Sequence, residues 1–290
     1  MVLIKQDTIL SPAKINLFLK VIKKQSNGLH QIYSLVSHVN LFDKIYISES
    51  SKDQIKFIGK FSKNISLKKN SIFKVMHYLR FYYPFLRKKK FNIKVEKNIP
   101  SGAGLGGGTS NAVSLLKFIL KKYELQLNKH KMKSILKKIG SDSYIFLNDY
   151  QKIIYGTGDK YKKFKSNLKL NLFLIFPNKS NLTQLIYKSH QRINVKYNLT
   201  LIIKSLHKNK FKFFEKNQND LLFSAIKNNS RLKKLFELLK AKSHLKLLQL
   251  TGSGSCCFVV LRNKKNLLNC QKIVKKHCKS YWTAVVKTTT

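Results

Sequence analysis

The chain is predicted to be an α+β protein with two domains, because strands and helices are mixed irregularly along it and no internal repeat is present. Its 290 residues are enough for two joined domains. Hydrophobic residues make up 43% of the chain and aromatic residues 11%, which argues against a disordered protein. A stretch rich in Lys, Ser and Asn at 160–169 marks the expected boundary, so the predicted domains are 1–162 and 163–290.

The first half is expected to contain strands, then a helix, a strand, a loop and further helices. Alternation with period two predicts strands at 13–23, 30–48 and 91–96, with a turn at Asn27-Gly28 between the first pair. Apolar residues at helical spacing predict helices over 70–80, from about Thr109 to Leu120, and over 129–139. A break at 140–143 and a strand at 152–156 follow.

The second half is expected to open with a buried strand at 170–176, which Pro177 ends. Four helices are predicted next, near 182–189, 198–208, 219–228 and 230–240. The last section is predicted to hold strands at 246–250, 256–262 and 281–287 and a helix at 264–276.

The charge of the chain is strongly positive, with 58 Lys and Arg against 12 Asp and Glu and a formal net charge of +46. Such a balance is typical of proteins that bind nucleic acid or anionic membranes. The lysines are spread along the whole chain without an arginine-rich patch, so dispersed, solvated lysine is favoured and no nucleic-acid or membrane partner is expected.

Membrane and secretory segments are not expected. No run of 18 apolar residues is present, and residues 1–8 lack the apolar centre of a signal peptide, so we expect a cytoplasmic protein. Cys256 and Cys257 are adjacent, whereas Cys270 and Cys278 lie far from them and from each other in the sequence. This spacing predicts neither a disulfide framework nor a zinc site, and no residue is assigned to a metal.

A glycine cluster at 100–110 is the strongest functional signal in the chain. It reads Pro-Ser-Gly-Ala-Gly-Leu-Gly-Gly-Gly-Thr-Ser and lies between a predicted strand and a predicted helix. Glycines let backbone N–H groups approach a ligand, and a helix N-terminus adds partial positive charge, so this arrangement is suited to phosphate.

Two other phosphate-binding loops are excluded by the same segment. A Walker loop needs Gly-Lys-Ser/Thr, and no lysine is present between residues 100 and 110. The pattern Gly-x-Gly-x-x-Gly occurs at Gly102, Gly104 and Gly107, but the acidic residue that a dinucleotide fold requires at the end of a second strand is missing. Glu124 has the right offset in a helix exit instead.

Four segments, in order, resemble the motifs of the GHMP kinases. The glycine loop is similar to the ATP-binding motif of that family, and Ser11–Leu19, which reads Ser-Pro-Ala-Lys-Ile-Asn-Leu-Phe-Leu, is similar to its first motif. Asn27-Gly28-Leu29-His30-Gln31, with the run to Asp43, matches a segment between these two motifs. Leu250–Phe258, which contains Gly252-Ser253-Gly254, is similar to the third motif.

The resemblance implies the two-domain GHMP kinase fold, with a ribosomal-protein-S5-like N-terminal domain and a ferredoxin-like C-terminal domain. It implies ATP and Mg²⁺ as cofactors and a cytidine diphosphate sugar-alcohol as the substrate whose hydroxyl is phosphorylated. The protein would be a monomer or a weak homodimer. Two alternatives stay open: a homoserine or mevalonate type of GHMP kinase, and a basic nucleic-acid-binding protein built on an S5-like domain.

The resemblance assigns ATP binding to the glycine loop and to an asparagine near the adenine. The loop residues are Pro100, Ser101, Gly102, Ala103, Gly104, Leu105, Gly106, Gly107, Gly108, Thr109 and Ser110, and the asparagine is Asn70. Thr109 and Ser110 offer hydroxyl groups to phosphate or Mg²⁺. Their alternative role is to cap the helix.

Catalysis is assigned by resemblance to Lys14 and Asp142. Asp142 lies in Gly-Ser-Asp-Ser-Tyr, which is similar to the family's Gly-Ala-Asp-Val-Pro, and it would be the general base. Without the other motifs, Asp142 would be interpreted as a turn or cap residue and Lys14 as a solvated lysine. Asn16 points to the same strand face as Lys14 and would join it at the acceptor.

Recognition of the cytosine is assigned to a second group of residues. In the family, an aromatic residue before the histidine stacks on the base; here Leu29 replaces it, and His30 would hydrogen-bond the edge of the base. Tyr187 resembles the aromatic residue on the opposite side. Gly252, Ser253 and Gly254 form a loop that, in the family, closes over triphosphate and substrate. A packed core histidine is the alternative interpretation of His30.

Overall fold

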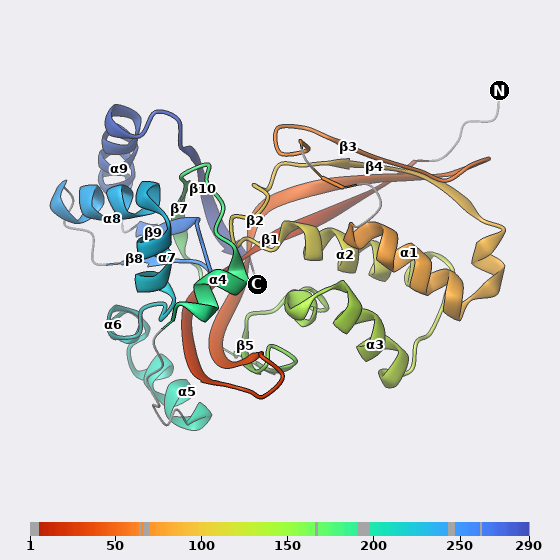
Figure 1. Cartoon of the computed structure of the whole chain (residues 1–290), viewed down its shortest axis with the longest axis horizontal. Helices are drawn as coiled ribbons and strands as arrows, with labels where there is room; N and C mark the ends of the chain where they lie inside the picture. The colour runs from red at the N-terminus through yellow and green to blue at the C-terminus, as the bar shows by residue number, and fades with distance from the viewer. Residues whose placement is uncertain are drawn as a thin grey trace. The chain divides into compact units, whose positions relative to one another are not determined.

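The computed structural model describes residues 6–63, 65–66, 70–165, 168–190, 198–242, 247–261 and 263–289. Strands and helices are mixed along the chain, which confirms the α+β class (Figure 1). The chain divides into two compact units whose segments are interleaved in the sequence. Unit 1 comprises Met1–Ala13, Leu41–Ser101 and Gly106–Asn148; unit 2 comprises Lys14–Asn40, Gly102–Leu105 and Asp149–Thr290.

Unit 1 is a sheet with helices packed beside it. Strand β1 (Asp7–Lys24) begins in this unit, and β2 (His30–Ser50) ends in it. Strand β4 (Lys90–Glu96) pairs antiparallel with β2 and parallel with β3 (Gln54–Ile58). The helices are α1 (Ser71–Tyr82), α2 (Gly107–Lys122) and α3 (Lys129–Ile139), with 3₁₀ turns η1 (Pro84–Arg87) and η2 (Ser141–Phe146).

Helices α1 and α2 lie side by side in unit 1 (Figure 1). The apolar residues that predicted them are buried, including Val75 and Leu79 on α1 and Leu115 and Leu116 on α2. Alternate residues of β4, such as Ile93 and Val95, are buried as well, as period two requires. The amphipathic pattern therefore explains both the helices and the strand.

Unit 2 contains an antiparallel sheet in the order β10-β7-β9-β8. Its strands are β7 (Asn171–Phe176), β8 (Leu248–Leu250), β9 (Cys257–Leu261) and β10 (Trp282–Thr289). The first half of β2 pairs with β5 (Lys152–Gly156), which pairs with β6 (Lys160–Lys163). The helices are α4 (Thr183–Lys188), α5 (Leu199–Lys208), α6 (Lys210–Lys216), α7 (Leu222–Asn228), α8 (Ser230–Lys242) and α9 (Lys264–His277).

The core of unit 2 lies between the sheet and helices α7, α8 and α9. Phe173 and Ile175 of β7 contribute alternate side chains to it, and Leu235 of α8 and Val274 of α9 meet them. Cys257, Cys270 and Cys278 all belong to this one cluster, although they are far apart in the sequence. All four cysteines are buried, and none of them forms a disulfide in the described part of the chain.

The predicted linker at 160–169 is partly wrong. Residues 160–163 form β6, which pairs antiparallel with β5, so the lysines there belong to a hairpin. Residues 166 and 167 lie outside the described part. The single boundary at 162/163 also differs from the interleaved units, and as a statement about family domains it stays a prediction.

Several elements differ from the prediction for local reasons. Strand β3, turn η1 and helix α6 were not predicted, because each is only 4 to 7 residues long and too short for a clear periodicity. Helix α2 begins at Gly107, before the predicted Thr109, since glycines weaken the helical signal there. Helix α3 and strand β5 have the predicted bounds.

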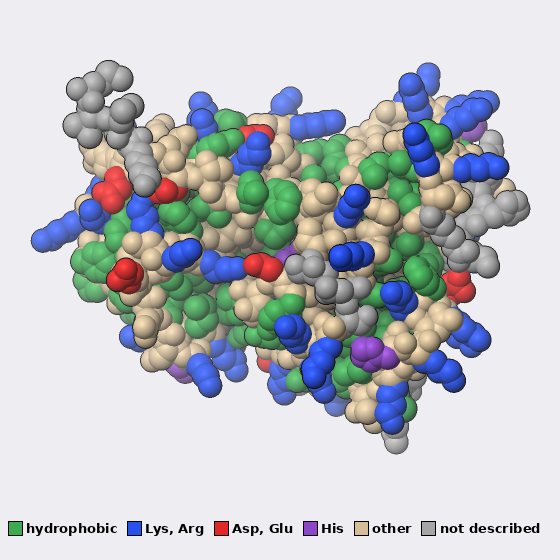
Figure 2. Space-filling view, turned by 180° about the vertical axis from the view of Figure 1, so that it is seen from behind, with side chains coloured by type: hydrophobic (Ala, Val, Ile, Leu, Met, Phe, Trp, Pro, Cys, Tyr) green, Lys and Arg blue, Asp and Glu red, His purple; other side chains and the backbone are tan. Residues whose placement is uncertain are grey.

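Lysine and arginine side chains are scattered over the visible face of the molecule in Figure 2 and are interspersed with apolar and neutral polar groups. On this face the lysines are dispersed and exposed, as the sequence predicts for most of them.

Candidate functional site

The glycine loop has its first half, Gly102–Leu105, in unit 2. There it is held by backbone hydrogen bonds, because the N–H of Lys14 donates to Leu105 O at 2.9 Å and the N–H of Cys256 donates to Ala103 O at 3.0 Å. Gly104 has φ +82°, and a Cβ atom on it would lie 2.5 Å from Thr251 O. Only glycine fits at this position, since a side chain would meet both unfavourable backbone geometry and a carbonyl oxygen.

The second half of the loop opens helix α2 in unit 1. Gly106 is the N-cap residue with φ +73°, and no side chain caps the helix. The alternative role of Thr109 and Ser110 as N-caps is therefore wrong, because both lie inside the helix. The Ser71 hydroxyl donates to Gly108 O at 2.7 Å and ties this turn to the start of α1. The N–H groups at the start of α2 need no side-chain cap if a ligand binds them.

Two buried oxygen atoms in the first turns of α2 lack a hydrogen bond within the described part of the chain. They are Ser110 Oγ and Asn111 Oδ1. A buried polar atom without a partner costs about 1–3 kcal/mol. A ligand that binds these oxygens would remove this cost.

Asn70 is the N-cap of α1. Its side-chain oxygen accepts from the N–H of Phe73 at 2.8 Å, and its Nδ2 donates to Ser66 O at 3.1 Å. The residue predicted for the adenine pocket thus has a structural function in the described chain. Its predicted contact with ATP is a separate proposal.

Asp142 lies in η2, directly after the end of α3, and is partly buried. The turn that contains Asp142 is closed by Ser143, whose hydroxyl donates to Gly140 O at 2.7 Å. A Cβ atom on Gly140 would lie 3.5 Å from Thr109 Oγ1, so the Asp142 turn and the first turn of α2 are neighbours. Unit 1 therefore brings together two of the segments that the sequence assigned to phosphoryl transfer.

Lys14 and Asn16 form a buried polar cluster in unit 2. Lys14 is 3% exposed, and its Nζ donates to Asn16 Oδ1 at 2.6 Å, which confirms that both side chains lie on one face of β1. Asn16 Nδ2 donates to Ser34 Oγ at 2.8 Å, and the backbone N–H of Asn16 donates to Thr251 Oγ1 at 3.0 Å. A cluster of polar groups this well hydrogen-bonded holds each side chain in one orientation.

The loop at Gly252-Ser253-Gly254 lies at this cluster. A Cβ atom on Gly252 would be 3.3 Å from Lys14 Nζ and 3.4 Å from Gly104 O. Segments from the N-terminus, the glycine loop and the C-terminal region thus meet within unit 2. The structure brings these predicted site residues together although they are far apart in the sequence.

Three side chains that the sequence did not single out fix the Gly252–Gly254 loop. Asn219 Nδ2 donates to Leu250 O at 2.9 Å and to Gly252 O at 2.8 Å. Asn181 Nδ2 donates to Ser253 O at 2.9 Å, and Thr183 Oγ1 lies 2.9 Å from Ser253 Oγ. Asparagine is common throughout this chain, so its composition gave no signal for these positions.

His30 and Tyr187 are neighbours in unit 2, although 157 positions separate them in the sequence (187 minus 30). Their ring centroids are 4.9 Å apart and the rings are tilted by 38°. Both were assigned to the same base, and the structure brings them together. Leu29 is 50% exposed, so its side chain is available for contact with a ligand.

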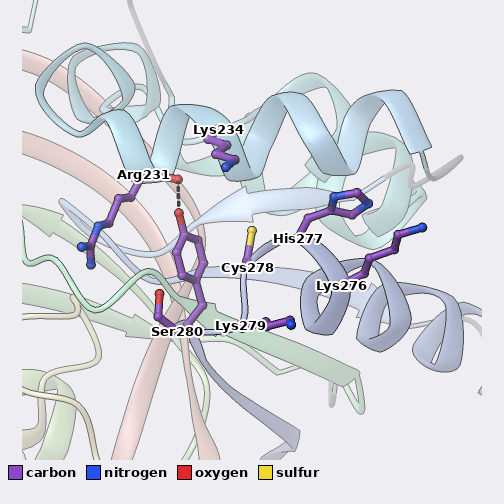
Figure 3. A pocket seen from close by; sticks show the side chains of 8 residues that line it. Arg231, Lys234, Lys276, His277, Cys278, Lys279 and Ser280 are labelled. Carbon is purple, nitrogen blue, oxygen red and sulfur yellow. Dashed lines mark hydrogen bonds between the residues drawn. The ribbon is translucent and has the colours of Figure 1, made fainter.

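A pocket of about 460 Å³ lies elsewhere in unit 2, at the ends of α8 and α9 (Figure 3). Basic side chains line it, including Arg231, Lys234, Lys276 and Lys279. Figure 3 shows Arg231 and Lys276 extending away from each other, so these charges do not converge on one point. None of the predicted site residues lines this pocket.

Two absences hold for the part of the chain that the structure describes. No helix there is long and apolar enough to cross a membrane. No group of three or more His, Cys, Asp or Glu residues is placed to hold a metal ion there.

Comparisons with known proteins agree on one family. The N-terminal domain of the GHMP kinases matches residues 70–148. A 4-diphosphocytidyl-2-C-methyl-D-erythritol kinase of Pelagibacter ubique (strain HTCC1062) is 35% identical over 96% of this chain and 97% of its own length. The protein of the same name from Prochlorococcus marinus (strain MIT 9515) is 32% identical over 88% of this chain and 86% of its own length.

Solved structures agree on the fold. A crystal structure of 4-(cytidine 5'-diphospho)-2C-methyl-D-erythritol kinase matches with a TM-score of 0.74 and 21% identity, over 97% of this chain and 99% of that one. A crystal structure of mevalonate kinase matches with a TM-score of 0.65 and 17% identity, over 98% of this chain and 99% of that one. At these identities the likeness concerns the fold.

Proposed function

Since the chain belongs to the 4-diphosphocytidyl-2-C-methyl-D-erythritol kinases, within the GHMP kinase family, we propose that it transfers the γ-phosphoryl group of ATP to the 2-hydroxyl of that cytidylyl substrate. The product is the 2-phosphate, and the reaction belongs to the non-mevalonate route to isopentenyl diphosphate. Both open alternatives from the sequence are thereby disfavoured: the homoserine or mevalonate type, and the nucleic-acid-binding protein.

The observation that carries this proposal is the meeting of three motif segments in unit 2. Lys14 and Asn16, Gly104, and Gly252 lie within contact distance of one another, as a site for an acceptor and a phosphate chain requires. Lys14 supplies a positive charge, and Asn16 holds its ammonium group in place. We assign to Lys14 the orientation and polarisation of the reacting hydroxyl.

Asp142 is proposed as the general base, which takes the proton from the 2-hydroxyl as the O–P bond forms. Its support is the neighbourhood of its turn to Thr109 at the start of α2. The family's proline is replaced by Tyr144, and the Ser143 hydroxyl bond to Gly140 O closes the turn here. This bond supplies a local constraint on the segment that carries Asp142.

ATP is proposed to bind along the glycine loop, with its phosphates at the N-terminus of α2 and its adenine near Asn70. Ser110 Oγ is buried and has no hydrogen-bond partner among the described residues. It could serve as a hydroxyl ligand of Mg²⁺ or donate a hydrogen bond to a phosphate oxygen. Since Mg²⁺ is usually held by one or two carboxylates together with substrate phosphates and waters, a cluster of three acidic residues is not required. When bound, Mg²⁺ neutralises charge on the phosphates.

The cytosine is proposed to lie against His30, Tyr187 and Leu29. His30 supplies a hydrogen-bonding edge and Tyr187 an aromatic face, and the two rings are in contact with each other. Leu29 offers apolar contact, which lacks the aromatic stacking worth about 1–3 kcal/mol per base.

The finer description of the architecture is also a proposal. We assign an S5-like N-terminal domain and a ferredoxin-like C-terminal domain, with the antiparallel β10-β7-β9-β8 sheet and its helices in support of the latter. A cytoplasmic location, a monomer or weak homodimer, and small molecules as the sole partners complete the proposal.

A coupled assay of ADP release tests the function. With ATP and Mg²⁺, 4-diphosphocytidyl-2-C-methyl-D-erythritol should be turned over, while homoserine and mevalonate should be inert. Equal turnover of mevalonate, or salt-sensitive RNA binding without kinase activity, would overturn the proposal. Removal of Mg²⁺ with a chelator should abolish turnover, and added Mg²⁺ should restore it.

A further inference from the structure

Asp43 lies within β2, in the part of this strand that belongs to unit 1, and none of its side chain is exposed to solvent. It forms a buried ion pair with Lys97, which is 3% exposed. Neither residue is assigned a role in catalysis or binding above. A buried charge pair stabilises a fold weakly or not at all compared with apolar residues of the same size, so stability alone is a poor reason for it.

The carboxylate has a second set of contacts, with the backbone that enters the glycine loop. Asp43 Oδ1 accepts from the N–H of Asn98 at 2.7 Å and from the N–H of Ile99 at 2.8 Å. Ile99 is fully buried and directly precedes Pro100, the first residue of the loop. The carboxylate therefore fixes the entry of the loop through two consecutive backbone groups.

The same carboxylate also lies close to the start of α2. A Cβ atom on Gly107, the first residue of α2, would lie 3.3 Å from Asp43 Oδ2 and 3.0 Å from Ile99 Cγ2. The start of α2 therefore has room for a glycine but not for a side chain against Asp43 and Ile99. Lys97 holds Oδ2 on its other side.

We propose that Asp43 is a positioning residue for ATP: it holds the backbone that enters the glycine loop and lies next to the start of α2, in the geometry that binds phosphate, and Lys97 orients its carboxylate. This inference rests on the proposed kinase function. Because Asp43 is fully buried behind the loop, it acts through the backbone and not by touching substrate.

Two double variants separate the hydrogen bonds of Asp43 from its charge. Asp43→Asn with Lys97→Met removes both charges and keeps an amide oxygen that accepts from the two N–H groups. Asp43→Leu with Lys97→Met removes the charges and the acceptor together. Neither leaves a single buried charge unpaired, which is the costly case.

A matched control in the same unit is the ion pair of Asp53 and Arg80. Asp53 accepts from Arg80 at 2.7 and 2.8 Å and from the backbone N–H of Phe91 at 3.0 Å, so its chemistry is similar, but it does not contact the glycine loop. Asp53→Asn with Arg80→Met should lower the melting temperature and leave the KM for ATP unchanged.

The measurements are KM for ATP, KM for the cytidylyl alcohol, and calorimetric Kd for ADP. The Asp43→Leu double variant should raise KM for ATP and Kd for ADP about tenfold or more, with KM for the alcohol changed less than about threefold, since two hydrogen bonds to the loop are lost. The Asp43→Asn double variant should stay within about threefold of wild type in all three. If the Asp43→Leu protein does not fold, Asp43→Ser with Lys97→Met replaces it, because the shorter side chain cannot reach both N–H groups.

Three results would overturn the positioning role. The first is unchanged ADP binding in the Asp43→Leu double variant. The others are a loss of ATP and ADP affinity in the Asp43→Asn double variant as large as in the Asp43→Leu one, or a rise in KM for ATP of the same size in the Asp53 control. Failure of the proposed function is separate. It would appear as wild-type protein that binds ADP but does not phosphorylate the cytidylyl alcohol, and the ADP measurements would still decide the role of Asp43.

Discussion

Glycines in the loop are required for two different reasons, and substitution by alanine separates them. Gly104 has φ +82°, and its backbone faces Thr251 O, where a Cβ atom would lie at 2.5 Å. Gly108 lies inside α2, and the nearest atom to a Cβ there would be Ser71 Oγ at 3.8 Å, an ordinary contact. The fold therefore requires glycine at 104 and tolerates a side chain at 108.

The expected sizes follow from these contacts. In Gly104→Ala, a positive φ costs about 1–2 kcal/mol and relief of the contact with Thr251 O costs about 1–3 kcal/mol. The lower entropy of the unfolded chain offsets about 0.4–1 kcal/mol, so the net loss should be about 1–5 kcal/mol. Gly108→Ala should be neutral or stabilising by up to about 1 kcal/mol, since alanine favours the helix.

Gly104 is the more important of the two glycines for stability, but Gly108 is expected to matter for ATP binding if the phosphates lie at the start of α2. Gly108→Ala should keep or slightly raise the wild-type melting temperature and should raise KM for ATP about tenfold or more, because a methyl group blocks close approach of the phosphates. Thermal denaturation and KM for ATP measured on both variants check this. Wild-type kinetics in Gly108→Ala would refute the assignment of this turn to phosphate, and an unchanged melting temperature in Gly104→Ala would refute the steric argument.

Three further predictions concern the catalytic residues, the recognition of the cytosine and the buried thiols. Asp142→Asn should lower kcat by about 10²–10⁴ with ADP binding intact, and Lys14→Met should lower kcat and weaken acceptor binding; a kcat near wild type would remove Asp142 from the role of base. Tyr187→Ala should raise KM for the cytidylyl substrate, and His30→Ala should reduce its preference over the uridylyl analogue, as steady-state kinetics with both substrates would show; an unchanged KM in Tyr187→Ala would place the stacking elsewhere. Burial raises the pKa of Cys256 to about 12, so the folded protein should not react with a thiol reagent at pH 8, and stability should fall as pH rises above about 8.5, where the unfolded thiol ionises; Cys256→Ala should reduce that slope.

The elements that the sequence predicted well are those with a long and regular pattern. Residues 129–139 repeat apolar positions at helical spacing and end at Gly140, and helix α3 has these bounds. Helix α6, with 7 residues, and strand β6, with 4, have too few positions to establish a period. Strand β6 also carries three lysines, so it has the composition of a linker, and only its pairing with β5 makes it a strand.

The site was predictable where a motif fixes local geometry and unpredictable where packing joins distant segments. The spacing of Lys14 and Asn16 on a strand was enough to predict their shared face, which the 2.6 Å hydrogen bond confirms. Asn219 follows no motif, yet it fixes the carbonyl of Gly252 from 33 positions away. Its function depends on a tertiary contact, and a single sequence carries no signal for it.

The high lysine content of this chain makes functional lysines hard to recognise in the sequence, but their burial distinguishes them in the structure. Among the described residues, only Lys14, Lys20, Lys97 and Lys152 are buried. Each is bound in a way that compensates a charge away from water: Lys20 and Lys97 pair with carboxylates, Lys152 lies over the rings of Tyr150 and Tyr161, and Lys14 donates to an amide oxygen. Lys14 and Lys97 also belong to the segments that resemble the kinase motifs or enter the glycine loop.

Exposed lysines add a long-range positive field that attracts anionic substrates and weakens with salt, whereas the contacts of the buried lysines change little with ionic strength. Added salt should therefore slow nucleotide association more than it lowers kcat.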